Sequence, residues 1–276
     1  MKSKGLIIGL IVFFSVLLIG FIVFFVILLN KGFNGLNINL GSRISNEKIY
    51  EKTYEETFEN IIINSDASKI EIKETDKNTV EVEVYGKEKN LTIKDSTNLE
   101  IEYKEGRCNF FCLNREIARI VVYLPSEYEN KIKIKNDAGN IEIGEFKYLN
   151  LVVDADAGNV SVGKADIVDI ENNAGNIKID TVNSAKITSD VGNIKINEVN
   201  EKFDIENNCG NIEIEYVNIT KDSSAKTDTG NITINHKNDI YVEGTTDVGK
   251  VNIDENNRKA EIKLDLKTNV GTINVK

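Results

Sequence analysis

The stretch Asp190-Val191-Gly192-Asn193-Ile194-Lys195-Ile196 decides the fold, because its pattern occurs eight times between Asp137 and Val275. Each copy has Asp or Asn, a small residue, Gly, a polar residue, and then two Ile or Val residues separated by one position. The intervals between successive glycines are 19, 17, 17, 18, 20, 19 and 22 residues. A near-constant period of this length is typical of a solenoid built from stacked coils. The eight glycines are Gly139, Gly158, Gly175, Gly192, Gly210, Gly230, Gly249 and Gly271.

Each copy carries two short strands. The residues two and four positions after Gly are always Ile or Val, as at Ile141 and Ile143, and this alternation predicts a strand with one buried face. A second pair lies five and seven positions before Gly, as at Ile205 and Phe203, although the sixth and seventh copies are weaker. The sequence therefore predicts an all-β fold, a parallel β-solenoid (β-helix) with two strands per coil.

The two turns of each coil differ in their variability. Around Gly the spacing is constant, whereas the other turn, the variable arc, spans six positions from Val162 to Val168 and eleven from Ile253 to Leu264. At the constant corner Gly permits a positive φ or close packing. We expect the small residue before Gly, such as Cys209, to point inward as a buried spacer. Any partner should contact the variable arc, where loops change without disturbing the stacked core.

The residue after Gly is Asn in six copies. Because stacked coils lie about 4.8 Å apart, we expect these amides to bond to one another as a ladder. Lys250 and Thr272 interrupt the row in the last two copies. The expected ladder residues are Asn140, Asn159, Asn176, Asn193, Asn211 and Asn231.

A row of Asp and Asn residues lies two positions before each Gly. One interpretation is that each side chain accepts a backbone N–H and caps its own turn, which explains why Asp and Asn interchange. The other is a calcium site between coils, since carboxylate oxygens suit a hard cation. The calcium candidates are Asp137, Asp156, Asp228 and Asp247, and the row also contains Asn173, Asp190, Asn208 and Asn269.

Few residues suit other chemistry. Cys108 and Cys112 are consistent with a small disulfide, with free thiols or with a metal role. His236 is the only histidine, so no hydrolase arrangement is supported, and we expect it to be solvated in a loop. The sequence predicts no catalytic residue, no cofactor and no small-molecule substrate.

The N-terminus has the pattern of a membrane anchor. An uncharged apolar run follows residues 1–4, and at about 1.5 Å per residue it is long enough to cross a hydrocarbon core of about 30 Å. We expect a cytoplasmic tail (1–4), a single transmembrane helix in the lipid bilayer (5–30), and a stalk (31–48). Lys2 and Lys4 favour a cytoplasmic N-terminus, which places the C-terminal domain outside the cell membrane.

The remainder reads as one β-domain. Residues 49–125 alternate strongly and contain Asp66-Ala67-Ser68-Lys69-Ile70-Glu71-Ile72, a copy of the pattern with Ser in place of Gly. We expect degenerate coils there that cap the solenoid, followed by the repeats in 126–276. The net charge of −10 argues against nucleic acid as a partner, because binding it depends on Lys and Arg contacts.

A single N-terminal span, the step Leu124-Pro125, and repeats such as the one at Gly192 resemble the bacterial DUF4097 family of adhesin-like proteins. LiaG-type membrane-anchored envelope proteins are similar in layout. The resemblance covers about residues 60–276 and implies a β-helical surface domain without catalytic residues. We therefore expect a membrane-anchored, extracytoplasmic, non-catalytic interaction module of the bacterial cell envelope.

Two alternatives remain at this point. The first is an accessory of a membrane system that senses envelope stress, in which the solenoid contacts another membrane protein. The second is a polysaccharide-active β-helix enzyme. The second is disfavoured because such sites need clustered acids or arginines on one exposed face, and arginine occurs only at positions 43, 107, 115, 119 and 258.

Overall fold

A computed structural model describes residues 43–105, 116–254 and 256–276. The predicted membrane helix (5–30) and the pair Cys108 and Cys112 lie outside these residues, so both stay predictions. Within the described ranges the sole helical segment is a 3₁₀ turn at Glu88–Asn90, and no helix there is long and apolar enough to span a bilayer. Strands make up most of the rest, which confirms the all-β, solenoid-like fold.

The strands follow one another with short connections. In chain order they are β1 (Arg43–Ile44), β2 (Lys48–Tyr54), β3 (Asn60–Ser65), β4 (Ser68–Thr75), β5 (Val80–Tyr85), β6 (Leu91–Asp95), β7 (Asn98–Tyr103), β8 (Glu116–Pro125), β9 (Lys131–Ala138), β10 (Ile141–Glu145) and β11 (Asn150–Ala157). They continue with β12 (Val160–Ala174), β13 (Ile177–Val191), β14 (Ile194–Cys209), β15 (Ile212–Val217), β16 (Ser223–Thr229), β17 (Ile232–His236), β18 (Tyr241–Val248), β19 (Val251–Ile253), β20 (Lys263–Val270) and β21 (Ile273–Val275).

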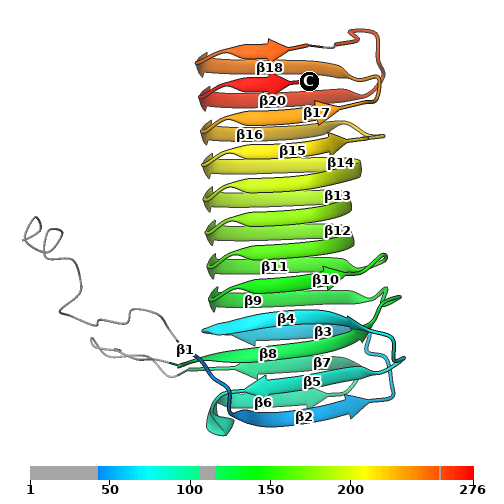
Figure 1. The fold of residues 1–276 in the computed structure, drawn as a ribbon, viewed down its shortest axis with the longest axis vertical. Helices are drawn as coiled ribbons and strands as arrows, with labels where there is room; N and C mark the ends of the chain where they lie inside the picture. The colour runs from blue at the N-terminus through cyan, green and yellow to red at the C-terminus, as the bar shows by residue number, and fades with distance from the viewer. Residues whose placement is uncertain (1–42, 106–115, 255) are drawn as a thin grey trace, which may run out of the picture. The chain divides into compact units, whose positions relative to one another are not determined.

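Each coil contributes one strand to each of two parallel sheets (Figure 1). The strand before the Gly corner lies in one sheet, as in β9, β11 and β16, and the strand after it lies in the other, as in β10, β15 and β17. Where the variable arc is shortest, the chain stays extended through it, so that β12, β13 and β14 each run from one sheet into the other. Equivalent residues of successive coils pair directly, for example Ile177 with Ile194 and Ile187 with Ile205.

The coils are not stacked in chain order at either end. At the C-terminal end, β20 pairs with both β16 and β18, and β21 pairs with both β17 and β19. The coil β20–β21 therefore lies between β16–β17 and β18–β19 (Figure 1). At the other end β3 lies between β7 and β9, while β4 lies between β8 and β10. At each end, therefore, the coil nearer that end of the chain, β3–β4 or β20–β21, is inserted between two coils that lie further inward along the chain.

The N-terminal end is closed by antiparallel strands. β6 pairs antiparallel with β7, while β5 pairs antiparallel with β8 and also with β2, the outermost strand of that sheet. The segment predicted to resemble a repeat lies at a corner in the stack, because Ile70 pairs with Ile141 and the amide of Ile70 donates to the carbonyl of Asn140 at 3.0 Å.

One continuous aliphatic core fills the space between the sheets. The residues two and four positions after Gly are at most 5% exposed in every coil except the outermost one. There Val251 is 37% exposed and Ile253 is half-buried. The seventh sequence copy is weak because it forms the end of the stack, whereas the eighth copy, with Leu264 and Leu266 fully buried, lies inside it.

Candidate functional site

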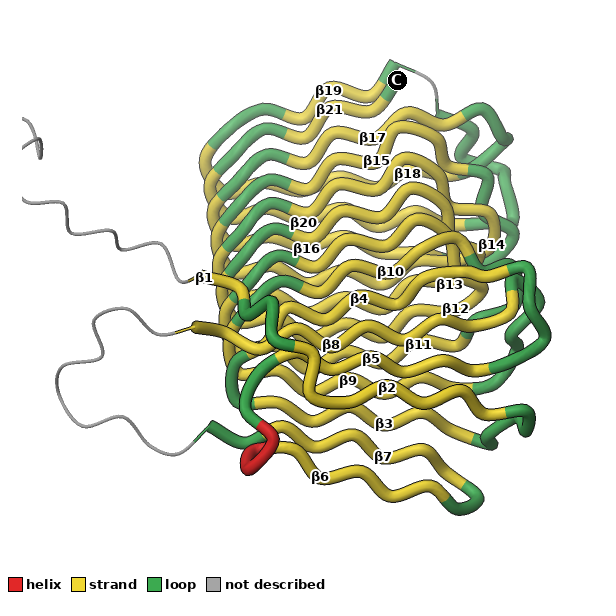
Figure 2. Tube along the Cα trace, turned by 60° about the horizontal axis from the view of Figure 1, so that its bottom comes forward, coloured by secondary structure: helices red, strands yellow, loops and turns green. Residues whose placement is uncertain are grey.

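The glycine corners form a single column along one edge of the stack (Figure 2). All eight glycines have φ between +114° and +157°, a region that residues with a Cβ rarely adopt. A Cβ on Gly192 would lie 1.9 Å from the carbonyl oxygen of Gly175 on the neighbouring coil, and the other corners are as tight. Glycine is therefore required for both its dihedral angles and its size. Gly249 follows Gly271 in this column, as the inserted coil demands.

The asparagines after Gly form a ladder, but not between amides as predicted. In six of the eight coils the backbone N–H of the residue after Gly donates to the side-chain oxygen of Asn on the neighbouring coil, at 2.8–3.1 Å; the donors are Asn159, Asn176, Asn193, Asn211, Asn231 and Thr272. Asn193, for example, donates its N–H to Asn176 Oδ1 at 2.9 Å. The amide of Asn can reach the backbone of the next coil because the corner leaves that N–H without a strand partner. The row is thus a backbone cap repeated along the stack.

The residue before Gly points outward, so the predicted inward spacer is wrong. Cys209 is exposed, and Val191, Val248 and Val270 are 56%, 64% and 48% exposed. The backbone bends at this residue to enter the corner, which breaks the alternation that would have turned its side chain inward. The side chains before Gly are therefore small because the corner is tight, and not because they must fit into the core.

The inward position of the corner is a row that the sequence reasoning missed, three residues before Gly. Its side chains are polar and buried in most coils, and several of them donate to the carbonyl oxygens of the glycine column. Asn207 Nδ2 donates to Gly192 O at 2.9 Å, and Thr268 Oγ1 donates to Gly230 O at 3.0 Å. The sequence did contain a signal for this row. These polar residues lie two positions after an aliphatic core residue, so the strand alternation turns them to the same inner face. The buried members are Asn136, Asn172, Ser189, Asn207, Thr227 and Thr268.

The inserted coil changes the spatial order of the Asp and Asn row two positions before Gly. Acids and amides alternate along the stack from the second coil onward, in the spatial order Asp156, Asn173, Asp190, Asn208, Asp228, Asn269 and Asp247. Each Asn donates to the Asp of the neighbouring coil, at 3.0, 2.8 and 3.0 Å. Two of the calcium candidates, Asp228 and Asp247, are therefore separated by Asn269.

The remaining calcium candidates lie on adjacent coils. Burial raises the pKa of Asp137, and the charges of Asp156 and Asp66 raise it further. The like charges of Asp156 and Asp66 are a smaller cause of this shift than burial, and a bound cation would relieve their repulsion. The calcium hypothesis for Asp137 and Asp156 stays a prediction, with this repulsion as its physical basis.

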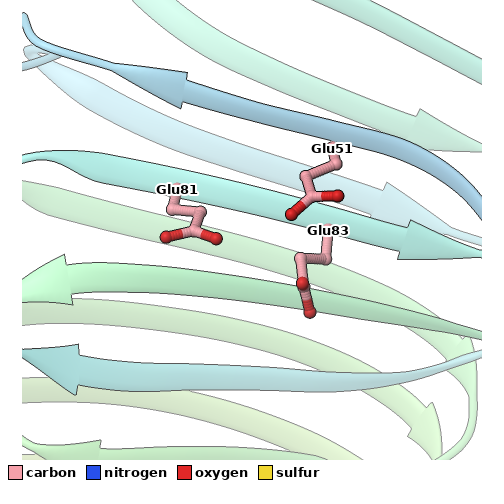
Figure 3. Close-up of side chains that lie close together, drawn as sticks. All are labelled: Glu51, Glu81 and Glu83. Atoms are coloured by element: carbon pink, nitrogen blue, oxygen red, sulfur yellow. The ribbon is translucent and has the colours of Figure 1, made fainter.

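A second carboxylate group lies at the N-terminal end and was not foreseen. The carboxylates of Glu51, Glu81 and Glu83 lie within 4.8 Å of one another on β2 and β5 (Figure 3). Lys48 Nζ lies 2.6 Å from Glu83 and 3.2 Å from Glu51. Burial raises the pKa of Glu83, but hydrogen bonds from Lys48 and Tyr85 outweigh it and lower the pKa. The lysine ammonium thus supplies the positive charge that a bound cation would otherwise provide.

The variable arc, in contrast to the corner edge, carries two cavities near the inserted coil. One has a volume of about 420 Å³ and is lined by His236, Lys237, Asn238, Asp239, Ile240, Asn256 and Asn257. The other, of about 270 Å³, is lined by Lys202, Asp204, Asp222, Ser223, Ser224, Lys263 and Asp265. Both linings mix charged groups with amides or hydroxyls, so they suit polar ligands.

His236 is half-buried in the larger cavity's wall, and the prediction that it is solvated is wrong. The following loop folds back on it and places its Nδ1 3.0 Å from the carbonyl oxygen of Asn238. A carbonyl only accepts, so Nδ1 carries a proton and Nε2 of the neutral ring is an acceptor. Nε2 and Asn238 Oδ1 are buried without a hydrogen-bond partner in the described part of the chain. An ordered water is the usual partner of polar atoms buried in this way.

Comparison with known proteins places this architecture in a family. A "putative adhesin" from Bacteroides fragilis shares 19% identity and a TM-score of 0.52, with 86% of this chain and 100% of that chain covered. A "putative adhesin" and a "putative lipid binding protein" from Parabacteroides distasonis share 15% and 13% identity, each with a TM-score of 0.47. The alignments cover 86% and 85% of this chain, respectively, and 100% of each of those chains.

At these identities the likeness shows the fold alone. No curated protein sequence matches the chain. The profile of the family described as Toastrack DUF4097 matches residues 58–276, which agrees with the resemblance drawn from the repeats. The chain belongs to the DUF4097 (Toastrack) family.

Proposed function

We propose that the protein is a membrane-anchored, extracytoplasmic and non-catalytic binding module of the bacterial cell envelope, adhesin-like in its action. Its ligand contacts lie on the variable arc, in or around the cavity between His236 and Asn257. The observation that carries this proposal is the contrast between the two edges of the stack. The corner edge uses its polar groups in repeated bonds between coils, whereas the variable arc holds the polar cavities.

The chemistry of the cavity indicates the kind of ligand. Lys237 and Asp239 give the cavity one exposed group of each charge, and the side chains of Asn256 and Asn257 add amides to its lining. A molecule that presents several hydroxyl or amide groups, such as a surface glycan, can bond to these groups. Tyr216 lies beside the cavity, 54% exposed, with Lys237 Nζ 5.3 Å from its ring centre.

The outward placement is tested by protease treatment of intact cells that express the full chain with a C-terminal tag. We expect the tag to be lost without lysis, because the proposal places residues 43–276 outside the membrane. Protection of the tag until the cells are lysed would contradict the proposal.

The binding role is tested with the full chain in detergent on an array of bacterial and host glycans. Asp239→Ala and Asn257→Ala should abolish the signal, because the Asn257 amide donates to Asp239 at 2.9 Å in the cavity wall. Lys226→Ala, on an exposed strand face away from the arc, is the matched control and should bind normally. Equal binding by all three variants would place the ligand elsewhere. Recovery of a sensor kinase by crosslinking in membranes would favour the stress-sensing alternative.

A further inference from the structure

The C-terminal end of the stack, here named the open end, is formed by strands parallel to their neighbours, whereas the N-terminal end is formed by the antiparallel strands β2 and β6. β18 pairs only with β20 and β19 only with β21 in the part of the chain that the structure describes, so their outer edges have no strand partner. Asn256 covers the start of this edge, since its side chain bonds both the N–H and the C=O of Val242. From Glu243 onward the edge is free. Unpaired strand edges are templates for pairing with another chain.

The open end also exposes Val251, whose counterparts lie in the interior of the other coils, beside Val248 and Val270 of the outward row before Gly. Val251 is 37% exposed, whereas its counterparts are 1% exposed or less. Val248 and Val270 are 64% and 48% exposed and pair with each other in adjacent coils. The three valines therefore form one apolar patch around the end of the stack. Water contact of such a patch is unfavourable unless a partner covers it.

The opposite end matches this edge less well than a second copy of the open end does. Its interior residues, such as Val82 and Val84, are fully buried, and its outer strands are antiparallel to their neighbours. Lys52 of β2 and Asp95 of β6 form an ion pair there. A parallel edge strand has no matching parallel edge to join at that end. The open end of a second copy has the same cross-section and the same exposed residues as this end, so it is the surface that matches it.

The charges at the corner are self-complementary. Asp247 precedes the corner on the incoming strand and Lys250 follows it on the outgoing strand, and both are exposed. Neither forms an ion pair with any residue that the structure describes. A two-fold axis parallel to the strands exchanges the incoming and outgoing arms of two facing coils. Each Asp247 then faces Lys250 of the other copy, and the interface is isologous and closed.

We propose that the protein forms a two-fold dimer through the open ends of two stacks, with β18 and β19 of one copy facing β19 and β18 of the other. The contact buries Val248, Val251 and Val270, pairs Asp247 with Lys250 across the axis, and satisfies the free strand edges. It does not depend on the ligand proposed for the variable arc. The dimer displays two variable arcs at opposite sides of one joint.

Sedimentation of the full chain in detergent, from about 1 to about 100 µM, tests the dimer, since this range brackets a micromolar Kd. We expect a dimer in the wild type and a monomer in Val248→Glu, with at least a tenfold weaker association. Val191→Glu is the matched control, because Val191 is 56% exposed in the same row but in the middle of the stack. It should remain dimeric, and far-UV circular dichroism should match the wild type in all variants.

Charge exchange separates this contact from association of the predicted membrane helix. Asp247→Lys and Lys250→Asp should each weaken the dimer, and the double variant should restore it. The proposal is overturned by a monomeric wild type, by equal effects of Val248→Glu and Val191→Glu, or by a double variant no stronger than the singles. Open-ended polymers in place of a dimer would overturn it as well.

Discussion

Replacing Gly192 by Ala tests the glycine column, the feature on which the stacking depends. The new Cβ would lie 1.9 Å from the carbonyl oxygen of Gly175, against an ordinary contact of about 3.5 Å. The φ of +153° adds backbone strain of about 1–3 kcal/mol in a residue with a side chain. Relief of the clash by separating the coils would break hydrogen bonds at the corner.

The bonds at risk set the magnitude. Gly175 N–H donates to Val191 O at 2.9 Å, and Asn193 N–H donates to Asn176 Oδ1 at 2.9 Å. At about 1 kcal/mol for each lost bond, together with the strain, we expect a loss of about 3–5 kcal/mol in the free energy of unfolding. That is a large part of the roughly 5–15 kcal/mol typical of folded domains.

Urea unfolding of the full chain in detergent, followed by far-UV circular dichroism, measures this loss. Gly163→Ala is the control, because its nearest atoms lie at 3.0 Å and its φ is not in the left-handed region. We expect the control to lose clearly less of its free energy of unfolding than Gly192→Ala, because its contact with Gly144 O, at 3.0 Å, is less severe. A Gly192→Ala variant as stable as the control would refute the column geometry.

Three further predictions concern single side chains. In a variant with Cys108→Ser and Cys112→Ser, Cys209 should react with a maleimide in the folded state as fast as in urea, because its side chain is exposed; protection would restore the buried interpretation. Asn207→Ala should cost about 1–3 kcal/mol in the free energy of unfolding, because it leaves the buried Gly192 carbonyl without its side-chain donor; a neutral effect in a urea titration would speak against the buried row. Burial raises the pKa of Glu71, but Lys69, Lys73 and Arg119 outweigh it and lower the pKa to about 2 from 4.5. Its contribution to stability is therefore present above pH 4.5 and lost as the pH falls toward 2, so Glu71→Gln should flatten the loss of stability across that window, and an unchanged slope in thermal melts would count against the assignment.

The repeat and its two strands were predictable because aliphatic alternation and glycine spacing are local properties of the sequence. Ile194 and Ile196 are fixed on the inner face by parity alone. The orientation of Cys209 was not predictable in this way, since the chain bends at that residue and parity no longer holds. The row of Asn207 and Thr268 was overlooked because a search for buried residues favours aliphatic ones, although their parity indicated burial.

The stacking order could not be read from the repeat, because every coil offers the same edges to every other coil. Two signals were nevertheless present. The seventh copy has Gly244 at a core position, which suits the end of a stack. The Asp and Asn row alternates only when Asn269 is placed between Asp228 and Asp247. The cavity near His236 depends on that order and on a loop without a repeating pattern, so the sequence alone did not reveal it.

The inserted coils at both ends of the stack should slow digestion by exopeptidases. A solenoid whose outermost coil carries the chain terminus can fray, and an exopeptidase then trims it one turn at a time. Here β21 is held between β17 and β19, so an enzyme that reaches β21 from its C-terminal side must first extract a strand that is paired on both sides. Digestion from that side should therefore stall until the whole C-terminal part of the stack opens at once.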